Sequence, residues 1–258
     1  MTLERRAAFL DEMGLAPLWQ RRDLPASVVN AQVSVSEGVA LEDAGPEPVA
    51  AFDASLPIPK APPSDEIASM DWIQLKETVA GCVKCGLCKG RTKTVFGVGD
   101  EKAKWLFIGE GPGRNEDQTG EPFVGQAGKL LDNMLRAIGV KRGENAYIAN
   151  IVKCRPTDEN GRDRPPTAEE ASACMPYLER QIALIQPTLL VALGKTAALS
   201  LLDVDPETPV SKLRGTVHSY AGLPLVVTYH PAYLLRNMAD KRKAWADLCL
   251  AMTTYANA

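Results

Sequence analysis

Cysteines form the first group of residues whose spacing could do chemistry. Cys82 and Cys85 make a C-x2-C pair, and Cys154 and Cys174 lie far downstream. A C-x2-C pair holds two thiolates within reach of one metal or cluster, so the four cysteines together could build a tetrathiolate site. Such a site suits structural zinc or a [4Fe-4S] cluster, and spacing alone does not choose between them. Unpaired buried thiols are the alternative.

Residues that are unusual for an apolar segment stand at the ends of several short apolar runs. Glu110, Asn150, Gly194 and His230 are each placed in this way. His230 also precedes a proline, and its position favours a catalytic role. The other histidine, His218, lies in a connecting segment and has no such support.

The loop after the first run is rich in glycine and carboxylates. It reads GEGPGRNEDQTGEPFVGQAGKLL from Gly109 to Leu131. Its glycines let backbone approach a ligand, and Pro112 stiffens the turn. Phe123 is a large apolar ring in a polar segment, so it is either anchored beneath the loop or exposed for stacking.

A scaffold must bring these segments together. Apolar runs predict strands over 105–108, 146–152, 188–193 and 224–228, and helical patterns cover 67–81, 127–138, 168–185, 195–202 and 232–254. Thr167-x-x-Glu170 is a capping box at the start of 168–185. This alternation predicts an α/β fold in which helices cover both faces of a parallel sheet. The carboxyl ends of the strands meet at one edge, so we place the site there.

Phosphate-binding loops are not supported. The segment at Gly128 lacks the first glycine and the hydroxyl residue of a Walker A motif, and the segment at Gly194 has Leu189 where the first glycine belongs. The glycines at 109, 111 and 113 do not form G-x-G-x-x-G either. The sequence therefore argues against nucleoside-triphosphate and dinucleotide binding.

The N-terminal part differs from the rest in composition. The composition predicts three parts: a helical segment over residues 1–23, a disordered acidic linker rich in Ala and Pro over residues 24–66, and the folded domain over residues 67–258. Residues 1–81 hold 6 basic and 13 acidic side chains, against 23 and 19 in the remainder, so a mildly basic body is compatible with a polyanionic partner. Without a membrane span or a signal-peptide core, we expect a cytoplasmic protein with no membrane association.

The motifs taken together closely resemble family 4 uracil-DNA glycosylases. The resemblance rests on GEGPGRNEDQTGEPFVGQAG, on NIVKCRP from Asn150, on TYHPAYLLR around His230, and on the four cysteines, and it covers about residues 78–250. It implies a three-layer α/β/α sandwich around a four-stranded parallel sheet. It also implies a [4Fe-4S] cluster held by Cys82, Cys85, Cys154 and Cys174. Cys88 falls outside the matching set and is expected not to bind it.

The resemblance also implies roles for individual residues. Glu110 and Gly111 contact the flipped base or position water, Phe123 stacks on uracil, Asn150 reads the base edge and His230 faces O2. The catalytic residues are then Glu110 and His230, with Asp117 as the second choice for the catalytic carboxylate. DNA contact falls to Pro112, Leu234, Leu235 and Arg236. Ala232 stands where the family motif often has serine, and this predicts weaker DNA affinity.

These features predict a monofunctional uracil-DNA glycosylase of base-excision repair. The enzyme would release uracil from single- or double-stranded DNA and leave an abasic site. We expect a monomer, with a possible repair or replication partner on the N-terminal segment. The alternative is a non-catalytic iron-sulfur DNA-binding module, which would have no need for the intact set of Glu110, Phe123, Asn150 and His230.

Overall fold

The structure, a computed structural model, describes residues 66–202 and 204–258. The predicted N-terminal helical segment (1–23) and all but the last residue of the predicted linker (24–66) lie outside the described residues, so both stay predictions. Within the described residues, no helix is long and apolar enough to cross a lipid bilayer.

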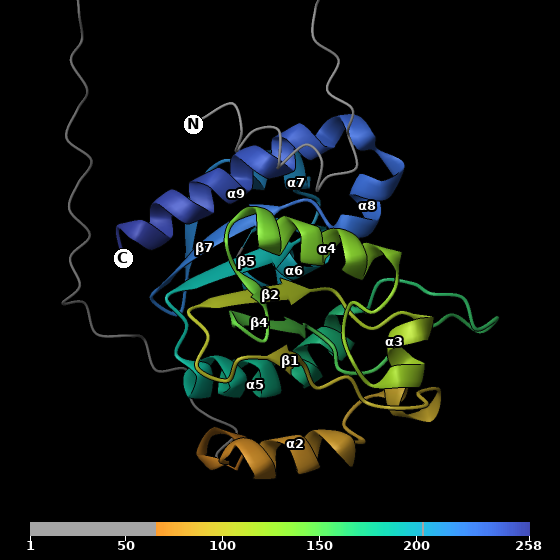
Figure 1. Cartoon of the computed structure of the whole chain (residues 1–258). Helices are drawn as coiled ribbons and strands as arrows, with labels where there is room; N and C mark the ends of the chain where they lie inside the picture. The colour runs from red at the N-terminus through yellow and green to blue at the C-terminus, as the bar shows by residue number, and fades with distance from the viewer. Residues whose placement is uncertain (1–65, 203) are drawn as a thin grey trace, which may run out of the picture. The chain divides into compact units, whose positions relative to one another are not determined.

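Four parallel strands form the centre of a seven-stranded sheet (Figure 1). They are β4 (Asn145–Asn150), β2 (Trp105–Gly109), β5 (Leu189–Leu193) and β7 (Leu223–Thr228), hydrogen-bonded in that order. Every residue of β2 and β5 is buried, as expected for parallel strands covered on both faces. The predicted four-stranded parallel sheet is therefore confirmed.

Three shorter strands extend this sheet and were not predicted. They are β1 (Val98–Gly99), antiparallel to β4, β3 (Lys141–Arg142), parallel to β4, and β6 (Val217–Tyr220), antiparallel to β7. Strands of two residues are too short to show a period of two, and β6 has no buried residue. Sequence patterning therefore could not identify them.

Helices cover both faces of the sheet (Figure 1). On one side lie α2 (Trp72–Ala80) and α5 (Ala168–Ile185), and on the other α4 (Gln126–Ala137), α8 (Pro231–Arg236) and α9 (Lys241–Ala256). The shorter helices are η1 (Ile67–Ser69), η2 (Gly86–Lys89), α3 (Arg114–Thr119), α6 (Lys195–Leu201), α7 (Val210–Leu213) and η3 (Met238–Asp240). The three-layer α/β/α arrangement is thus confirmed.

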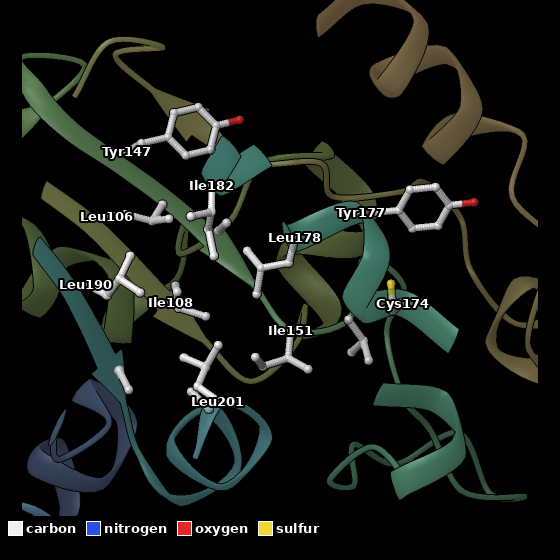
Figure 2. Close-up of a cluster of buried hydrophobic side chains, with 14 of the residues drawn as sticks. Leu106, Ile108, Tyr147, Ile151, Cys174, Tyr177, Leu178, Ile182, Leu190 and Leu201 are labelled. Carbon is white, nitrogen blue, oxygen red and sulfur yellow. The ribbon is translucent and has the colours of Figure 1, made fainter. Parts of the chain in front are cut away.

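The largest core cluster lies between the sheet and α5 (Figure 2). Leu106, Ile108 and Leu190 of the strands face Leu178 and Ile182 of α5. The start of α5 is fixed as predicted: Thr167 accepts a hydrogen bond from the Glu170 amide and the Glu170 carboxylate accepts one from the Thr167 amide. This packing holds the cysteine-bearing end of α5 against the sheet.

The prediction of one helix over 232–254 is wrong in one respect, because the helix is interrupted at Asn237. Asn237 has φ −127° and ψ 72°, and both its backbone amide and its Nδ2 donate to the carbonyl oxygen of Tyr233. The Tyr233 hydroxyl donates to Oδ2 of Asp240 at 2.6 Å across the break. A separate short helix, α8, therefore follows His230.

Candidate active site

The ends of β2, β4 and β7 bring the predicted pocket residues together. Gly109 at the end of β2 pairs with Asn150 at the end of β4. A Cβ atom on Gly109 would lie 2.5 Å from Asn150 Oδ1 and 2.6 Å from Phe123 Cζ. The Phe123 and His230 rings are stacked, with centroids 5.5 Å apart and planes at 29°. Glycine is therefore required at position 109 because two site side chains converge on it.

Asn150 has an unusual hydrogen-bonding state. The residue is 1% exposed, and its Oδ1 is the buried side-chain acceptor without a partner among the described residues. Leaving such an atom unpaired costs about 1–3 kcal/mol, so buried orphan acceptors usually have a functional explanation. Oδ1 is placed to accept a hydrogen bond from a ligand beside Gly109 and Phe123.

His230 is held as a neutral donor. Its Nδ1 accepts a hydrogen bond from the Ala232 amide at 3.1 Å, which leaves the proton on Nε2. Burial lowers the pKa of His230 to about 4, with a smaller contribution in the same direction from Arg236. At neutral pH the ring therefore offers an Nε2–H donor without carrying charge.

Glu110 extends the site from the end of β2 toward α6. Its Oε2 accepts a hydrogen bond from the Thr196 hydroxyl in the first turn of α6. Burial raises the pKa of the Glu110 carboxyl, and the Thr196 hydrogen bond partly opposes this shift. The carboxylate is thus fixed in direction and has one oxygen free of that contact.

Phe123 is held in a strained conformation that the sequence did not reveal. Its φ of 55° is rare for a bulky residue and persists only where the surroundings enforce it. Arg142 donates to the carbonyl oxygens of Pro122 and Phe123 at 2.8 and 2.9 Å. Oε1 of Glu116 accepts from the amides of the two residues after Phe123, at 3.0 and 3.2 Å. Arg142 and Glu116 therefore fix the direction of the Phe123 ring.

Gly128 completes this support from α4. A Cβ there would lie 1.7 Å from the carbonyl oxygen of Phe123, so no side chain fits. A glycine inside a helical pattern costs about 1 kcal/mol relative to alanine, so it is a signal in the sequence that calls for a packing reason. Arg142 gave no such signal, because its partners lie 19 and 20 residues earlier in the chain.

The predicted DNA-contacting residues divide by exposure. Leu235 is 40% exposed and Arg236 is exposed at the end of α8, as a surface contact requires. Leu234 is fully buried and Pro112 is buried, so neither side chain is presented at the surface as Leu235 and Arg236 are, and their contact with DNA stays a prediction. α8 packs against α4, and Leu234 is one of its two buried residues.

Two further predicted site residues have defined surroundings. Asp117, the second-choice carboxylate, is 4% exposed, and its Oδ1 accepts from the Thr92 amide at 2.8 Å. This contact ties α3 to the loop after the first cysteines. A Cβ on Gly111 would lie 2.7 Å from Val152 Cγ2, so Gly111 lets the loop pass close to the end of β4. The catalytic role of Asp117 and base contact by Gly111 stay predictions.

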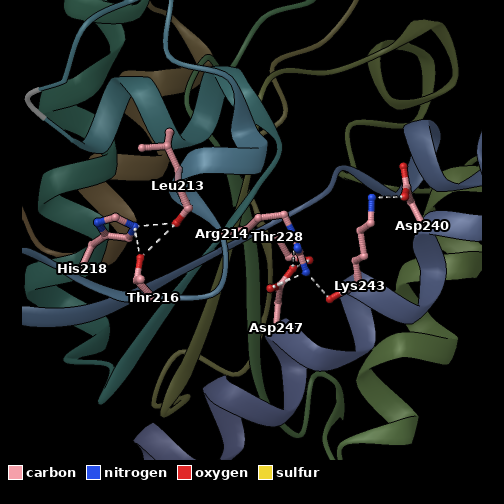
Figure 3. A network of polar contacts seen from close by, with 8 residues as sticks. All are labelled: Leu213, Arg214, Thr216, His218, Thr228, Asp240, Lys243 and Asp247. Carbon is pink, nitrogen blue, oxygen red and sulfur yellow. Dashed lines mark hydrogen bonds and ion pairs between the residues drawn. The ribbon is translucent and has the colours of Figure 1, made fainter. Parts of the chain in front are cut away.

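A polar network supports the segment that carries His230 (Figure 3). Asp247 of α9 is 1% exposed and accepts from Thr228 Oγ1 at 2.9 Å and from Arg214 Nε and Nη2 at 3.0 and 2.8 Å. Thr228 ends β7, two residues before His230. The Arg214 guanidinium also lies 5.1 Å from the centre of the Tyr229 ring. The network thus anchors the strand end on which His230 stands.

His218 takes part in a structural contact instead. Its Nε2 lies 2.6 Å from the Leu213 carbonyl oxygen and 3.2 Å from Thr216 Oγ1, and both are shown in Figure 3. It stands on β6, at an edge of the sheet. The expectation that it lacks support for a catalytic role agrees with this position.

The four predicted cysteine ligands lie in one region beside α5. Cys174, seen at the end of the core cluster in Figure 2, and Cys154 both interact electrostatically with Cys82, and Cys154 does so also with Cys85. Arg91 donates to Cys154 Sγ at 3.4 Å. Among residues 66–202 and 204–258, no three or more His, Cys, Asp or Glu side chains are spaced to hold a single metal ion.

The donors around these sulfurs fit a thiolate site. Backbone amides of Lys84 and Lys153 point at Cys82 Sγ and Cys174 Sγ, at 3.5 and 3.3 Å. Together with the Arg91 guanidinium, these N–H groups would stabilise negative charge on sulfur. Cys88 lies close by, with its amide donating to the Cys85 carbonyl oxygen at 3.3 Å. Its predicted exclusion from the ligand set stays a prediction.

Comparisons with known proteins agree with this geometry. The model of the Uracil DNA glycosylase superfamily matches residues 96–249. A Type-4 uracil-DNA glycosylase from Thermotoga maritima is 43% identical over 168 residues, which cover 65% of this chain and 84% of the relative. Proteins of the same name from Archaeoglobus fulgidus and Pyrobaculum aerophilum are 46% and 38% identical, over 61% and 70% of this chain and 79% and 93% of the relatives. The strand-end residues and the four cysteines therefore lie in a chain that belongs to the uracil DNA glycosylase superfamily and, within it, to the type-4 uracil-DNA glycosylases.

Proposed function

We propose that this protein hydrolyses the N-glycosidic bond of a flipped-out deoxyuridine in DNA, releasing uracil and leaving an abasic site for base-excision repair. The observation that carries this proposal is the orphan Oδ1 of Asn150, which faces the edge of the pocket next to Phe123. The type-4 relatives bear the name of this activity, which supports it.

The pocket matches the hydrogen-bonding edge of uracil. With the base stacked on Phe123, Asn150 Oδ1 accepts from N3–H and the amide nitrogen donates to O4. The Nε2–H of His230 donates to O2, where negative charge develops as the glycosidic bond breaks. A donor aimed at charge that appears only in the transition state is typically worth about 3 kcal/mol.

Glu110 acts on the sugar side of the same bond. Bond cleavage leaves an oxocarbenium-like sugar, and an anionic carboxylate fixed by Thr196 can stabilise it and orient a water toward C1′. The water oxygen bonds to C1′, the electron pair of the C1′–N1 bond leaves with uracil, and a proton is released. Since the pKa of His230 is about 4, its titration should not shape the rate between pH 5 and 8.

Cys82, Cys85, Cys154 and Cys174 would hold a [4Fe-4S] cluster. When bound, the cluster supplies a covalent tie between the loop after α2, the end of β4 and α5, without a redox step in base removal. Arg91 draws the same parts together, because it donates to the Cys82 and Ala80 carbonyl oxygens as well as to Cys154 Sγ. Purified protein should be brown, with four irons per chain.

DNA contact falls to the exposed end of α8. Leu235 can fill the space left by an extruded nucleotide, and Arg236 can pair with phosphate. The substrates we propose are uracil-containing single- and double-stranded DNA. We further propose that the protein acts as a cytoplasmic monomer and that residues 1–23 bind a repair or replication partner.

The test is excision from a uracil-containing oligonucleotide followed by alkaline cleavage of abasic sites. Wild-type protein should cut the uracil strand and leave a thymine-containing control intact. His230→Gln should lower the single-turnover rate by about 10²-fold or more, whereas the matched control His218→Gln should retain it. No product from either single- or double-stranded DNA would refute the glycosylase and leave the iron-sulfur DNA-binding module.

A further inference from the structure

Lys153 is a buried lysine with no part in the mechanism above. It is 1% exposed and lies in the chain between the pocket residue Asn150 and the cysteine Cys154. Its Nζ donates to the Asn150 carbonyl oxygen at 2.9 Å and to Gln181 Oε1 at 2.6 Å. The ammonium therefore contacts the backbone of the residue whose side chain carries the orphan acceptor.

Every other polar group of Lys153 is also engaged. Its amide donates to Cys174 Sγ at 3.3 Å, and its carbonyl oxygen accepts from the Val95 amide at 2.7 Å. Gln181 is in turn fixed, since it is fully buried and its Nε2 donates to the Phe96 carbonyl oxygen at 2.9 Å. One residue thus joins β4, α5 and the loop after the first cysteines.

Burying an ammonium is expensive, and a hydrophobic side chain of the same length would avoid the cost. The ion pairs found among residues 66–202 and 204–258 give Lys153 no carboxylate partner. What the lysine provides in return is a donor for two acceptors, the Asn150 carbonyl oxygen and Gln181 Oε1, and the first of these belongs to the pocket residue itself.

We propose that Lys153 is a positioning residue that fixes the base-reading Asn150 and couples it to the cysteine site. Asn150 is held on one side by the pairing of β4 with β2, where the Ile151 amide donates to the Gly109 carbonyl oxygen at 2.9 Å. Lys153 holds it on the other side, because its Nζ donates to the Asn150 carbonyl oxygen. Asn150 Oδ1 is thereby kept beside Gly109 and Phe123. Because the Lys153 amide donates to Cys174 Sγ, a displacement of Cys174 would move Lys153 and, through it, Asn150.

The inference rests on the proposed function, and its test uses free uracil as well as DNA. Lys153→Met keeps the length of the side chain and removes its donors. The inhibition constant for free uracil should rise about tenfold, the value expected for a lost hydrogen bond to charge, while iron content and visible absorbance stay at the wild-type level. The rate of the double variant Lys153→Met/Asn150→Leu should equal that of Asn150→Leu alone, because both changes act through Asn150.

Lys241→Met is the matched control. Lys241 is also buried, at 6% exposure, but it begins α9 on the other side of the sheet. We expect it to change the melting temperature and leave the uracil inhibition constant unchanged. If Lys153→Met does not fold, Gln181→Leu, which removes the second acceptor of the ammonium, should weaken uracil binding in the same way.

Three results would overturn the inference. The first is an unchanged uracil inhibition constant in a folded Lys153→Met variant. The second is a double variant whose loss in rate equals the sum, in free energy, of the losses of Lys153→Met and Asn150→Leu. The third is a rise in the uracil inhibition constant in Lys241→Met equal to that in Lys153→Met. A wild-type protein that excises no uracil would refute the proposed function instead, so the two failures are distinguishable.

Discussion

Replacing Asn150 by leucine should stabilise the protein and remove base recognition at the same time. Asn150 is 1% exposed and its Oδ1 has no partner among the described residues. An unsatisfied buried acceptor costs about 1–3 kcal/mol, and leucine has the same branching without the polar atoms. At about 2–4 °C per kcal/mol for a chain of this size, the melting temperature should rise by roughly 2–12 °C.

The same change should impair catalysis. Without Oδ1, uracil N3–H enters the pocket unpaired, and the single-turnover rate should fall about 10- to 100-fold. The assays are a thermal melt without ligand, single-turnover excision and inhibition by free uracil. Iron content measured on the same samples shows whether the cysteine site is intact.

Thr228→Val provides the contrasting control. Thr228 is fully buried at the end of β7, but its hydroxyl is satisfied by Asp247 at 2.9 Å. Its loss should therefore lower the melting temperature. The reasoning is refuted if Asn150→Leu is destabilised as much as Thr228→Val, or if it still binds uracil as the wild type does.

Three further changes probe the rest of the site. Burial raises the pKa of Glu110, so the single-turnover rate should fall with decreasing pH beginning above the ordinary carboxyl range, and Glu110→Gln should be slower and lack this acid limb in its pH profile. Gly194 has φ +96°, and a Cβ there would lie 2.9 Å from Cβ of His230. Gly194→Ala should therefore displace His230 and weaken inhibition by uracil, without changing the visible absorbance. Arg142→Met leaves the Phe123 carbonyl oxygen without its donor, so it should lower the free energy of unfolding by about 1–3 kcal/mol in a denaturant titration and raise KM. A KM equal to that of the wild type would refute the role of Arg142 in fixing the Phe123 ring.

The four parallel strands could be predicted from the sequence, because β2, β4, β5 and β7 are short apolar runs separated by segments of helical periodicity. The interruption of the last helix at Asn237 could not be predicted. It depends on contacts between Asn237 and Tyr233 and between Tyr233 and Asp240, in a stretch whose residues are all compatible with one helix. Apolar spacing records which side of a helix is buried and does not record where hydrogen bonds to the next element end it.

The same limit applies to surface contacts. Leu234 and Leu235 are chemically identical neighbours, yet the packing of α8 in the fold buries the first completely and leaves the second 40% exposed. Phe123 shows a related effect, because its direction depends on Arg142 and Gly128. These contacts join elements whose relative position no local pattern specifies.

The sequence by itself determined the kinds of side chain available for chemistry and the edge of the sheet at which they meet. Strand and helix periods are local, and parallel strands place their carboxyl ends together whatever the loops do. The tertiary structure decided the hydrogen-bonding state of each group. Within the part of the chain that the structure describes, Asn150 Oδ1 has no partner, Nδ1 of His230 accepts from the Ala232 amide, and Lys153 is hydrogen-bonded to both Asn150 and Cys174. Such pairing depends on ångström-scale distances between segments far apart in the chain, and these distances exist only once the core has packed.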